Sequence, residues 1–205
     1  MSPSISSAPS EAVPSAALGS IGPNQVFDDK DGNGERDPDN EPQLANVTVD
    51  LYCYHENGTA MLTSTNVTDE NGEYVFNNVL PGACFIQVTP EVDGVDYVFS
   101  PINPDCTTEC NQIQQNGTSP TVDVDWNDVI DNWDVGMYQP VTIGNKVWED
   151  ANGNGQQDEG EDGMVGITVV LVDANGDTVA TTITGADGSY WFTNQASTRH
   201  IWCGI

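Results

Sequence analysis

The chain has 205 residues, of which 32 are acidic and only 4 are lysine or arginine, giving a formal net charge of −28. No basic patch is available to neutralise phosphates, so nucleic acid and anionic membrane surfaces are disfavoured as partners and divalent cations are favoured. The 20 glycines and 12 prolines, with short alternating strands between turns, predict an all-β chain of tandem antiparallel sandwiches. No stretch approaches transmembrane length, so no direct membrane insertion is expected.

Residues 1–20 are rich in Pro, Ser and Ala and predict a flexible, partly extended linker. This segment has neither a basic start nor an apolar core long enough for a signal peptide. Because other features of the sequence, given below, predict export, we expect a fragment of a longer secreted protein whose signal peptide is not present in this chain.

A calcium-loop motif begins at Asp29. The loop positions 1, 3, 5, 6 and 9 of an EF-hand are matched here by Asp29, Asp31, Asn33, Gly34 and Asp37. Glu35 stands at position 7, where a backbone carbonyl is used. Position 12 is Asn40 and the glutamate follows one residue late, so the closing ligand is left open, with Glu41 as the candidate.

The residues after this loop predict a strand instead of the helix of an EF-hand. Val47, Val49, Leu51 and Cys53 alternate with more polar residues up to a turn at Asn57-Gly58. A hairpin through residues 71–76 and a strand in the segment "VLPGACFIQVT" follow. Calcium at such a loop has no helix pair to open, which excludes a calcium switch.

The five cysteines leave at least one thiol unpaired within the chain. Cys53 and Cys84 share the inward phase of their strands, so they either form a bridge or remain two buried free thiols. Cys106 and Cys110 lie in a long excursion at about 100–125 and can pair locally in an oxidising compartment. His55 and His200 show no zinc-ligand spacing with the cysteines.

Export is predicted from two further features. Sequons for N-glycosylation occur at Asn46, Asn57, Asn66 and Asn116. Weakly enclosed calcium loops also suit the millimolar calcium found outside cells. The expected location is therefore extracellular or at the cell surface.

The motif recurs in a more complete form in the second half of the chain. Its expected ligands are Asp150, Asn152, Asn154, Gln156, Asp158 and Glu161, with Gln156 contributing only its backbone carbonyl. Asn, Asp and Gly also dominate turns that bind no metal, but two copies with this spacing favour Ca²⁺ as the cofactor.

The second half repeats the strand pattern of the first. Ile167, Val169 and Leu171 alternate up to a turn at Asn175-Gly176, and residues 187–192 repeat the later hairpin. Trp148 and Trp191 fall at core-like positions in this pattern. The tail after about residue 192 lacks the strand seen in the first half, so the second sandwich is expected to be truncated there.

The block "IGNKVWEDANGNGQQDEGEDGMVGITVVLVDANGDTVATTITGADGSYWF" resembles the B-repeat domain of serine-aspartate repeat adhesins, the SdrD B-like family. These domains belong with the collagen-adhesin B-type β-sandwiches, which are prealbumin-like (transthyretin-like) or Ig-like. The resemblance implies domains at 21–140 and 141–205, each with a calcium loop between its first two strands. It also implies spacer domains that hold an adhesive or protective region away from the cell wall.

Related domains often carry a Lys–Asn isopeptide cross-link, which this sequence does not favour. Lys30, the only lysine of the first module, lies inside the calcium loop, and Lys146 of the second flanks outward-facing positions. No nucleophile elbow, phosphate loop or partnered histidine indicates an enzyme.

The function predicted from the sequence is a calcium-binding structural or spacer module of an extracellular or cell-surface, adhesin-like protein. Its expected partners are calcium ions and, through other parts of the full-length protein, an extracellular protein or glycan ligand. The alternatives are a carbohydrate- or protein-recognition module and an acidic protein that organises mineral.

Overall fold

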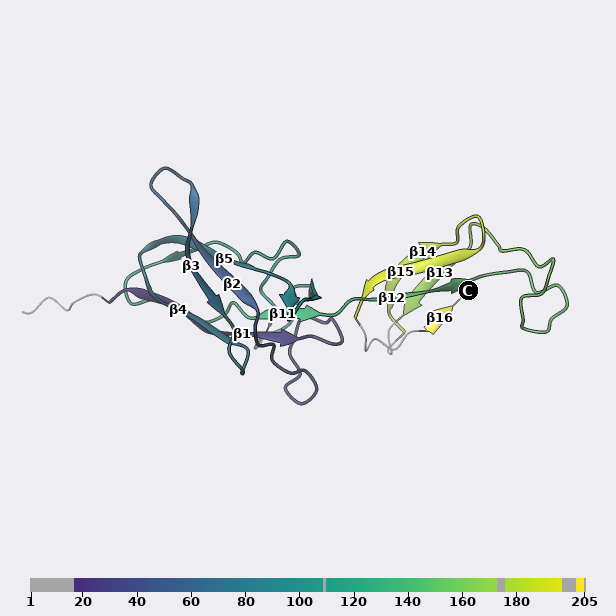
Figure 1. Cartoon of the computed structure of the whole chain (residues 1–205), viewed down its shortest axis with the longest axis horizontal. Helices are drawn as coiled ribbons and strands as arrows, with labels where there is room; N and C mark the ends of the chain where they lie inside the picture. The colour runs from purple at the N-terminus through teal and green to yellow at the C-terminus, as the bar shows by residue number, and fades with distance from the viewer. Residues whose placement is uncertain (1–16, 109, 173–175, 197–201, 205) are drawn as a thin grey trace, which may run out of the picture.

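The computed structural model describes residues 17–108, 110–172, 176–196 and 202–204. In these ranges the secondary structure consists of strands, with no helix, as the sequence predicted, and therefore no helix that could cross a membrane. The strands form two groups in tandem, joined by a short connection after Tyr138 (Figure 1). We call residues 19–138 the first module and residues 141–204 the second.

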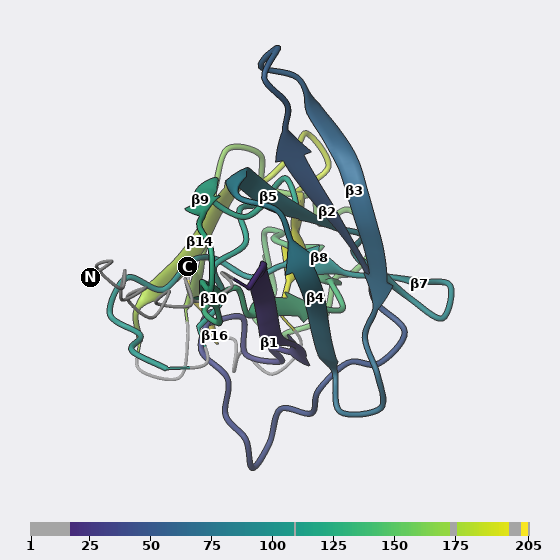
Figure 2. The ribbon, with the colours of Figure 1, turned by 90° about the vertical axis from the view of Figure 1, so that its left-hand side faces the viewer.

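The first module is built from two packed sheets, seen from the end in Figure 2. In one sheet β1 runs antiparallel to β4 and parallel to β10 and β11, and β8 extends the sheet beyond β11. The other sheet has the antiparallel order β3-β2-β5-β9, and β6 and β7 form a separate small hairpin. The strands are β1 (Gly19–Asp28), β2 (Thr48–Tyr54), β3 (Ala60–Val67), β4 (Glu73–Val79), β5 (Gly82–Val88), β6 (Glu91–Val92), β7 (Val95–Asp96), β8 (Val98–Phe99), β9 (Val122–Val124), β10 (Val129–Ile130) and β11 (Val135–Tyr138).

The second module repeats the first five strands in the same order. Strand β12 pairs with β15 as β1 pairs with β4, and β13 pairs with both β14 and β16 as β2 pairs with β3 and β5. The strands are β12 (Val141–Lys146), β13 (Thr168–Val172), β14 (Thr178–Ile183), β15 (Ser189–Gln195) and β16 (Trp202–Gly204). The internal repeat seen in the sequence is therefore also a repeat of strand pairing.

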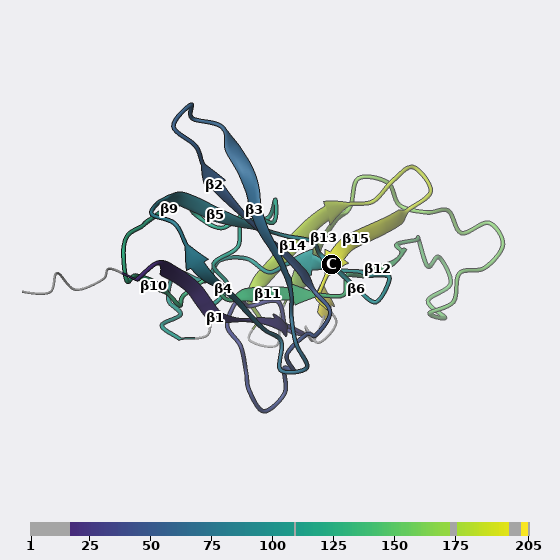
Figure 3. The ribbon, with the colours of Figure 1, turned by 60° about the vertical axis from the view of Figure 1, so that its left-hand side comes forward.

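Alternating side chains make the core of each module, as the period-2 pattern predicted. Val49 and Leu51 of β2 are at most 1% exposed and pack with Ile86 of β5. Val169 and Leu171 occupy the same positions on β13. The β2–β3 hairpin continues past this core and projects from the module (Figure 3), with its turn at Asn57-Gly58 as predicted.

Two boundaries differ from the sequence prediction. Gly19 and Ser20, expected to be linker, already belong to β1, because their backbones pair with β4. Strand β15 continues past Phe192 to Gln195, and β16 forms beyond it, so strand structure extends further than expected. Most of the predicted linker and Asn175 of the predicted turn lie outside the described residues.

Candidate metal centre

The first loop starts where β1 ends, and its backbone curls around the carboxylate of Asp29. One Asp29 oxygen accepts the amide of Asn33 at 3.1 Å, and the other accepts the amide of Gly34 at 2.8 Å. Gly34 has φ +79°, a conformation that side chains other than glycine rarely adopt. Asp29 is fully buried, so its negative charge lies inside the loop.

Glu41 closes this loop from the opposite side. Its Oε1 accepts the amide of Asp31 at 3.4 Å and its Oε2 accepts the amide of Asp37 at 2.9 Å. Asn40, the residue at the usual closing position, instead donates its side-chain amide to Asp37. Carboxylate oxygens of Asp29, Asp31 and Glu41 all lie within 4.8 Å of one another, so Glu41 is the acid that joins the cluster.

The electrostatics of the cluster favour a bound cation. Burial raises the pKa of Glu41, and the charges of Asp29 and Asp31 raise it further. Hard oxygen donors gathered in this way are the ligands that Ca²⁺ takes in proteins. The donor set therefore fits calcium, which would relieve the repulsion between the carboxylates.

The remaining predicted ligands of the first loop lie at its rim. The amide of Glu35 donates to Asn33 Oδ1 at 2.6 Å, and the Glu35 side chain is exposed. Asp37 is also exposed, and the hydrogen bond from the Asn40 side chain lowers the pKa of Asp37. The carboxylate of Asp37 is not part of the close acidic group.

The second loop reproduces these hydrogen bonds with the complete spacing. The Asp150 carboxylate accepts the amides of Gly153, Asn154 and Gly155, and the Gly155 bond is the main reason why the pKa of Asp150 is lowered. Glu161 accepts the amides of Ala151 and Asp158, both at 3.0 Å. The two loops therefore share much of their hydrogen-bond pattern, with the first acid and the closing glutamate both accepting backbone amides.

The loops differ in how their ligands are gathered. In the second loop Asp158 accepts the side-chain amides of Asn152 and Asn154 at 2.8 and 2.7 Å. The amide of Gln156 donates to Asn154 Oδ1, as Glu35 does to Asn33. Within the described ranges, a close group of three acidic side chains occurs in the first loop, around Glu41, and not in the second.

Comparison with known proteins assigns this sequence to a family. The SdrD B-like domain matches residues 19–137 and again residues 141–201. The chain belongs to the SdrD B-like domain family. The match covers both modules and includes both loops, which confirms the resemblance seen in the sequence.

Curated relatives of this SdrD B-like chain include serine-aspartate repeat-containing proteins. Protein D of Staphylococcus aureus (strain Newman) is 33% identical over 172 residues, which is 83% of this chain and 12% of that protein. Protein F of Staphylococcus epidermidis (strain ATCC 12228 / FDA PCI 1200) is 37% identical over 172 residues, or 82% of this chain and 10% of that protein. The chain thus spans only a small part of the length of these relatives.

Solved structures with a similar arrangement include the Bacillus anthracis TIE protein. The likeness covers 86% of this chain and 26% of that one, with a TM-score of 0.37 and 18% sequence identity. At this TM-score the likeness supports no conclusion about function.

The cysteines of the first module are joined in two pairs. Cys53 and Cys84 face each other across β2 and β5 and form a disulfide. Cys106 and Cys110 form a second disulfide in the connection between β8 and β9. These are the pairs that the sequence allowed.

The four predicted glycosylation sites differ in exposure. The side chain of Asn66 is half-buried and donates to the Val75 carbonyl at 2.6 Å. The other three are exposed: Asn46, Asn57 and Asn116. Glycosylation stays a prediction, and the exposed asparagines are its best candidates.

The expectation that Trp148 and Trp191 are both core residues is wrong for Trp191. Its side chain is 60% exposed, whereas Phe192 beside it is buried. Successive side chains of a strand point to opposite faces, so Phe192 in the core directs Trp191 outward, where it lies over Gly144 of β12. Trp148 is half-buried.

A threonine that supports the segment after each loop was not singled out from the sequence. The Thr68 hydroxyl donates to the Leu44 carbonyl at 2.7 Å and accepts the Val47 amide at 3.0 Å. Thr184 bonds to Met164 and Ile167 in the same way. Alignment of the two internal repeats places these threonines at equivalent positions, and this equivalence is the sequence feature from which their shared role could have been predicted.

Proposed function

We propose that this chain is a calcium-stiffened structural module of an extracellular or cell-surface, adhesin-like protein. The observation that carries the proposal is the cluster of Asp29, Asp31 and Glu41 in a loop attached to the strand that leaves the module. Family membership supports the structural and cell-surface role, and the donor chemistry supports calcium as the ion. Ligands of the full-length protein would bind through other regions.

The attachment runs through the backbone of the first ligand. The Asp29 amide donates to the Met137 carbonyl at 2.8 Å, and Asp28 pairs with Met137 in the parallel β1–β11 ladder. Met137 is followed by Tyr138, the last residue of β11, and β12 begins at Val141. An ion that holds Asp29 in place thereby restrains the strand that leads into the second module.

The same corner of the first module faces the second module. The Tyr138 hydroxyl donates to the Asn194 carbonyl of β15 at 3.1 Å. A cavity of about 580 Å³ lies at this junction, lined by Gly32 of the metal loop, Pro101, Tyr138 and Asn194, among others. A rigid metal loop would therefore limit bending between the modules as well as local unfolding.

Calcium would supply positive charge and several oxygen-binding positions where this chain has gathered negative charge. An ion that binds only the folded state stabilises it by about 2.7 kcal/mol at a concentration one hundred times its dissociation constant. The chain has a net charge of −28, so a bound cation would also stabilise the folded state by reducing the electrostatic repulsion among its acidic side chains. The melting temperature should therefore depend on calcium.

Thermal unfolding in calcium, in magnesium and in EDTA tests the proposal. The melting temperature should rise in calcium and fall in EDTA, with a smaller effect of magnesium because magnesium requires tighter octahedral geometry. The variant Glu41→Gln removes a ligand charge and should lose the calcium response of the first loop. The control Glu35→Gln alters an exposed side chain beside it and should retain that response. An identical melting temperature in calcium and EDTA would falsify the proposal.

The exposed Trp191 favours a second candidate, a recognition module that stacks a sugar on its indole ring. Trp191 lies over Gly144, so one face of the ring is supported by the strand. Retention of specific glycans on an array, lost in Trp191→Ala, would support this function. Uniform absence of retention would remove it.

A further inference from the structure

The two candidate metal loops share much of their hydrogen-bond pattern but differ in what covers them. A Cβ atom on Gly34 would lie 2.1 Å from the Pro101 carbonyl oxygen, so another segment packs directly on the first loop. Gly155 holds the same place in the second loop and has open space around it. Residues 150–160 of the second loop are all exposed, whereas Asp29 and Gly34 are buried.

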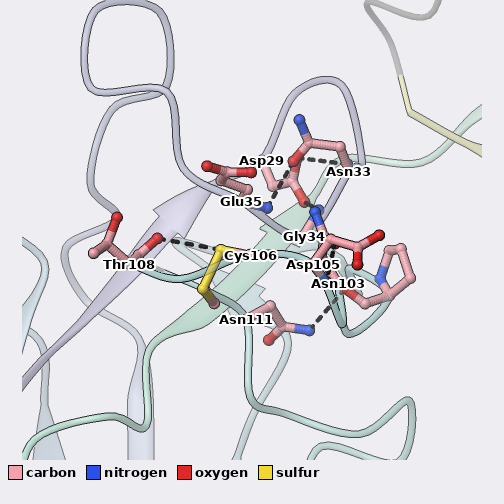
Figure 4. The surroundings of a disulfide bond; sticks show 11 residues. Asp29, Asn33, Gly34, Glu35, Asn103, Asp105, Cys106, Thr108 and Asn111 are labelled. Carbon is pink, nitrogen blue, oxygen red and sulfur yellow. Dashed lines mark hydrogen bonds between the residues drawn. A yellow bond between two sulfur atoms is a disulfide. The ribbon is translucent and has the colours of Figure 1, made fainter.

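The cover is the connection between β8 and β9, which we call the excursion (residues 100–121). Its Asn111 amide donates to the Gly34 carbonyl at 2.9 Å. Cys110 forms an isolated antiparallel bridge with Glu35. Figure 4 shows the Cys106–Cys110 disulfide beside Glu35 and below Asn33 and Gly34 of the loop.

This bridge orients the residue that occupies position 7 of the loop. The hydrogen bond of this bridge runs from the Asn111 amide to the Gly34 carbonyl, so it joins the chain neighbours of the two bridged residues. Glu35 is therefore at a non-hydrogen-bonded position of the bridge. The backbone groups of Glu35 therefore face away from the excursion, and its amide indeed donates to Asn33 Oδ1. The Glu35 carbonyl, the expected ligand at this position, is thus turned away from the excursion.

The excursion is itself fixed to the module by the side chain of Asn111, which is fully buried. Its Nδ2 donates to the carbonyls of Ser100 at 2.7 Å and Ile113 at 3.0 Å. Its Oδ1 accepts the amides of Ile113 at 3.1 Å and of Gly136, on β11, at 3.2 Å. The metal loop therefore rests on a support that is anchored in the sheet.

We propose that the Cys106–Cys110 disulfide and Asn111 act as a clasp that holds the first loop in its binding conformation before calcium arrives. This inference rests on the proposed calcium function. Ordering a backbone residue costs about 1–2 kcal/mol, and a loop that is already ordered spends less of its binding energy on this step. The first loop should then bind calcium more tightly than the open second loop.

Calcium titration by calorimetry on the full chain tests the clasp one loop at a time. Glu161→Gln leaves the first loop as the functional site, and Glu41→Gln leaves the second. In the Glu161→Gln background, the double change Cys106→Ala and Cys110→Ala should weaken calcium binding at least tenfold. The matched control, Cys53→Ala with Cys84→Ala, removes the disulfide between β2 and β5 and should change the affinity less than threefold.

A second measurement does not depend on calcium. Hydrogen exchange of the Glu35 amide in EDTA should be faster without the Cys106–Cys110 disulfide, while exchange of the equivalent Gln156 amide stays unchanged. Unaltered affinity and unaltered exchange in the clasp variant would overturn the inference and leave the calcium function standing. Absence of calcium binding by the parent chain would instead overturn the proposed function on which it rests.

Discussion

The Tyr74 hydroxyl donates a hydrogen bond to the Trp133 carbonyl inside the first module, joining β4 to the segment before β11. Tyr74 is 1% exposed. Burial raises the pKa of the Tyr74 phenol well above 10, and the nearby charge of Asp134 raises it further.

This buried phenol predicts sensitivity to alkaline pH. The pKa of Tyr74 is higher in the folded state than in the unfolded state. The contribution of Tyr74 to the free energy of unfolding is therefore fully present below pH 10 and is lost as the pH rises toward the folded-state pKa. The parent should lose about 1.4 kcal/mol of unfolding free energy for each pH unit above 10, relative to Tyr74→Phe. Urea unfolding of both proteins at several alkaline pH values measures the difference; parallel pH profiles would contradict the assignment.

The close contact between Gly34 and the Pro101 carbonyl predicts an unusually damaging substitution. In Gly34→Ala the positive φ strains the backbone by about 1–2 kcal/mol. The added methyl group would also lie 2.1 Å from the Pro101 carbonyl oxygen, so one of the two segments must move. Gly58→Ala is the matched control in the same module, since Gly58 has φ +76° and nothing within 4 Å of the added atom. Urea unfolding should show a clearly larger loss for Gly34→Ala; equal losses would show that the excursion yields to the methyl group.

The disulfide between β2 and β5 predicts a large stability contribution. Cys53 and Cys84 are 31 residues apart in the chain, and closing a loop of this size in the unfolded state is worth roughly 3–4 kcal/mol. Replacing both cysteines by alanine should lower the free energy of unfolding by about that amount. A loss below about 1 kcal/mol would indicate that the strand pairing already restrains these segments in the unfolded chain.

Local patterns predicted much of this structure. The alternation of apolar and polar residues around Val49 and Leu51 was enough to predict the β-sandwich, because burial of one face of a strand imposes a period of two residues. The residue spacing that starts at Asp29 was enough to predict the loop. Its Asx-type hydrogen bonds, from the amides of Asn33 and Gly34 to the Asp29 carboxylate, form between near neighbours in the chain. These features depend on short stretches of chain.

Features that depend on distant segments were not predictable in the same way. The contact of Gly34 with Asn111 joins residues whose proximity is set by the packing of the whole module. The closing residue of the first loop could not be chosen from the sequence, because Asn40 stands at the usual position and Glu41 follows it directly. The fold places the Glu41 carboxylate close to that of Asp29. Trp191 was expected in the core, but Phe192 is buried instead, so Trp191 lies on the opposite face of the strand.

The equivalent threonines predict a shared structural role that can be tested in both modules. Thr68→Val keeps the shape of the side chain but leaves the Leu44 carbonyl and Val47 amide without their hydrogen-bond partner. Unsatisfied buried groups cost about 1–3 kcal/mol each, so the first module should lose roughly 3 kcal/mol. Thr184→Val should weaken the second module through Met164 and Ile167.

Thr68→Ser is the control for this prediction, because it keeps the hydroxyl and removes only a methyl group. Its loss should be about 1 kcal/mol, well below that of Thr68→Val. The segment between Leu44 and Val47 joins the first loop to β2. Loss of this anchor should therefore also speed hydrogen exchange of the Asn46 amide, which donates to the Thr68 carbonyl at 3.0 Å. Equal stability of the valine and serine variants would show that the hydroxyl does not hold this segment.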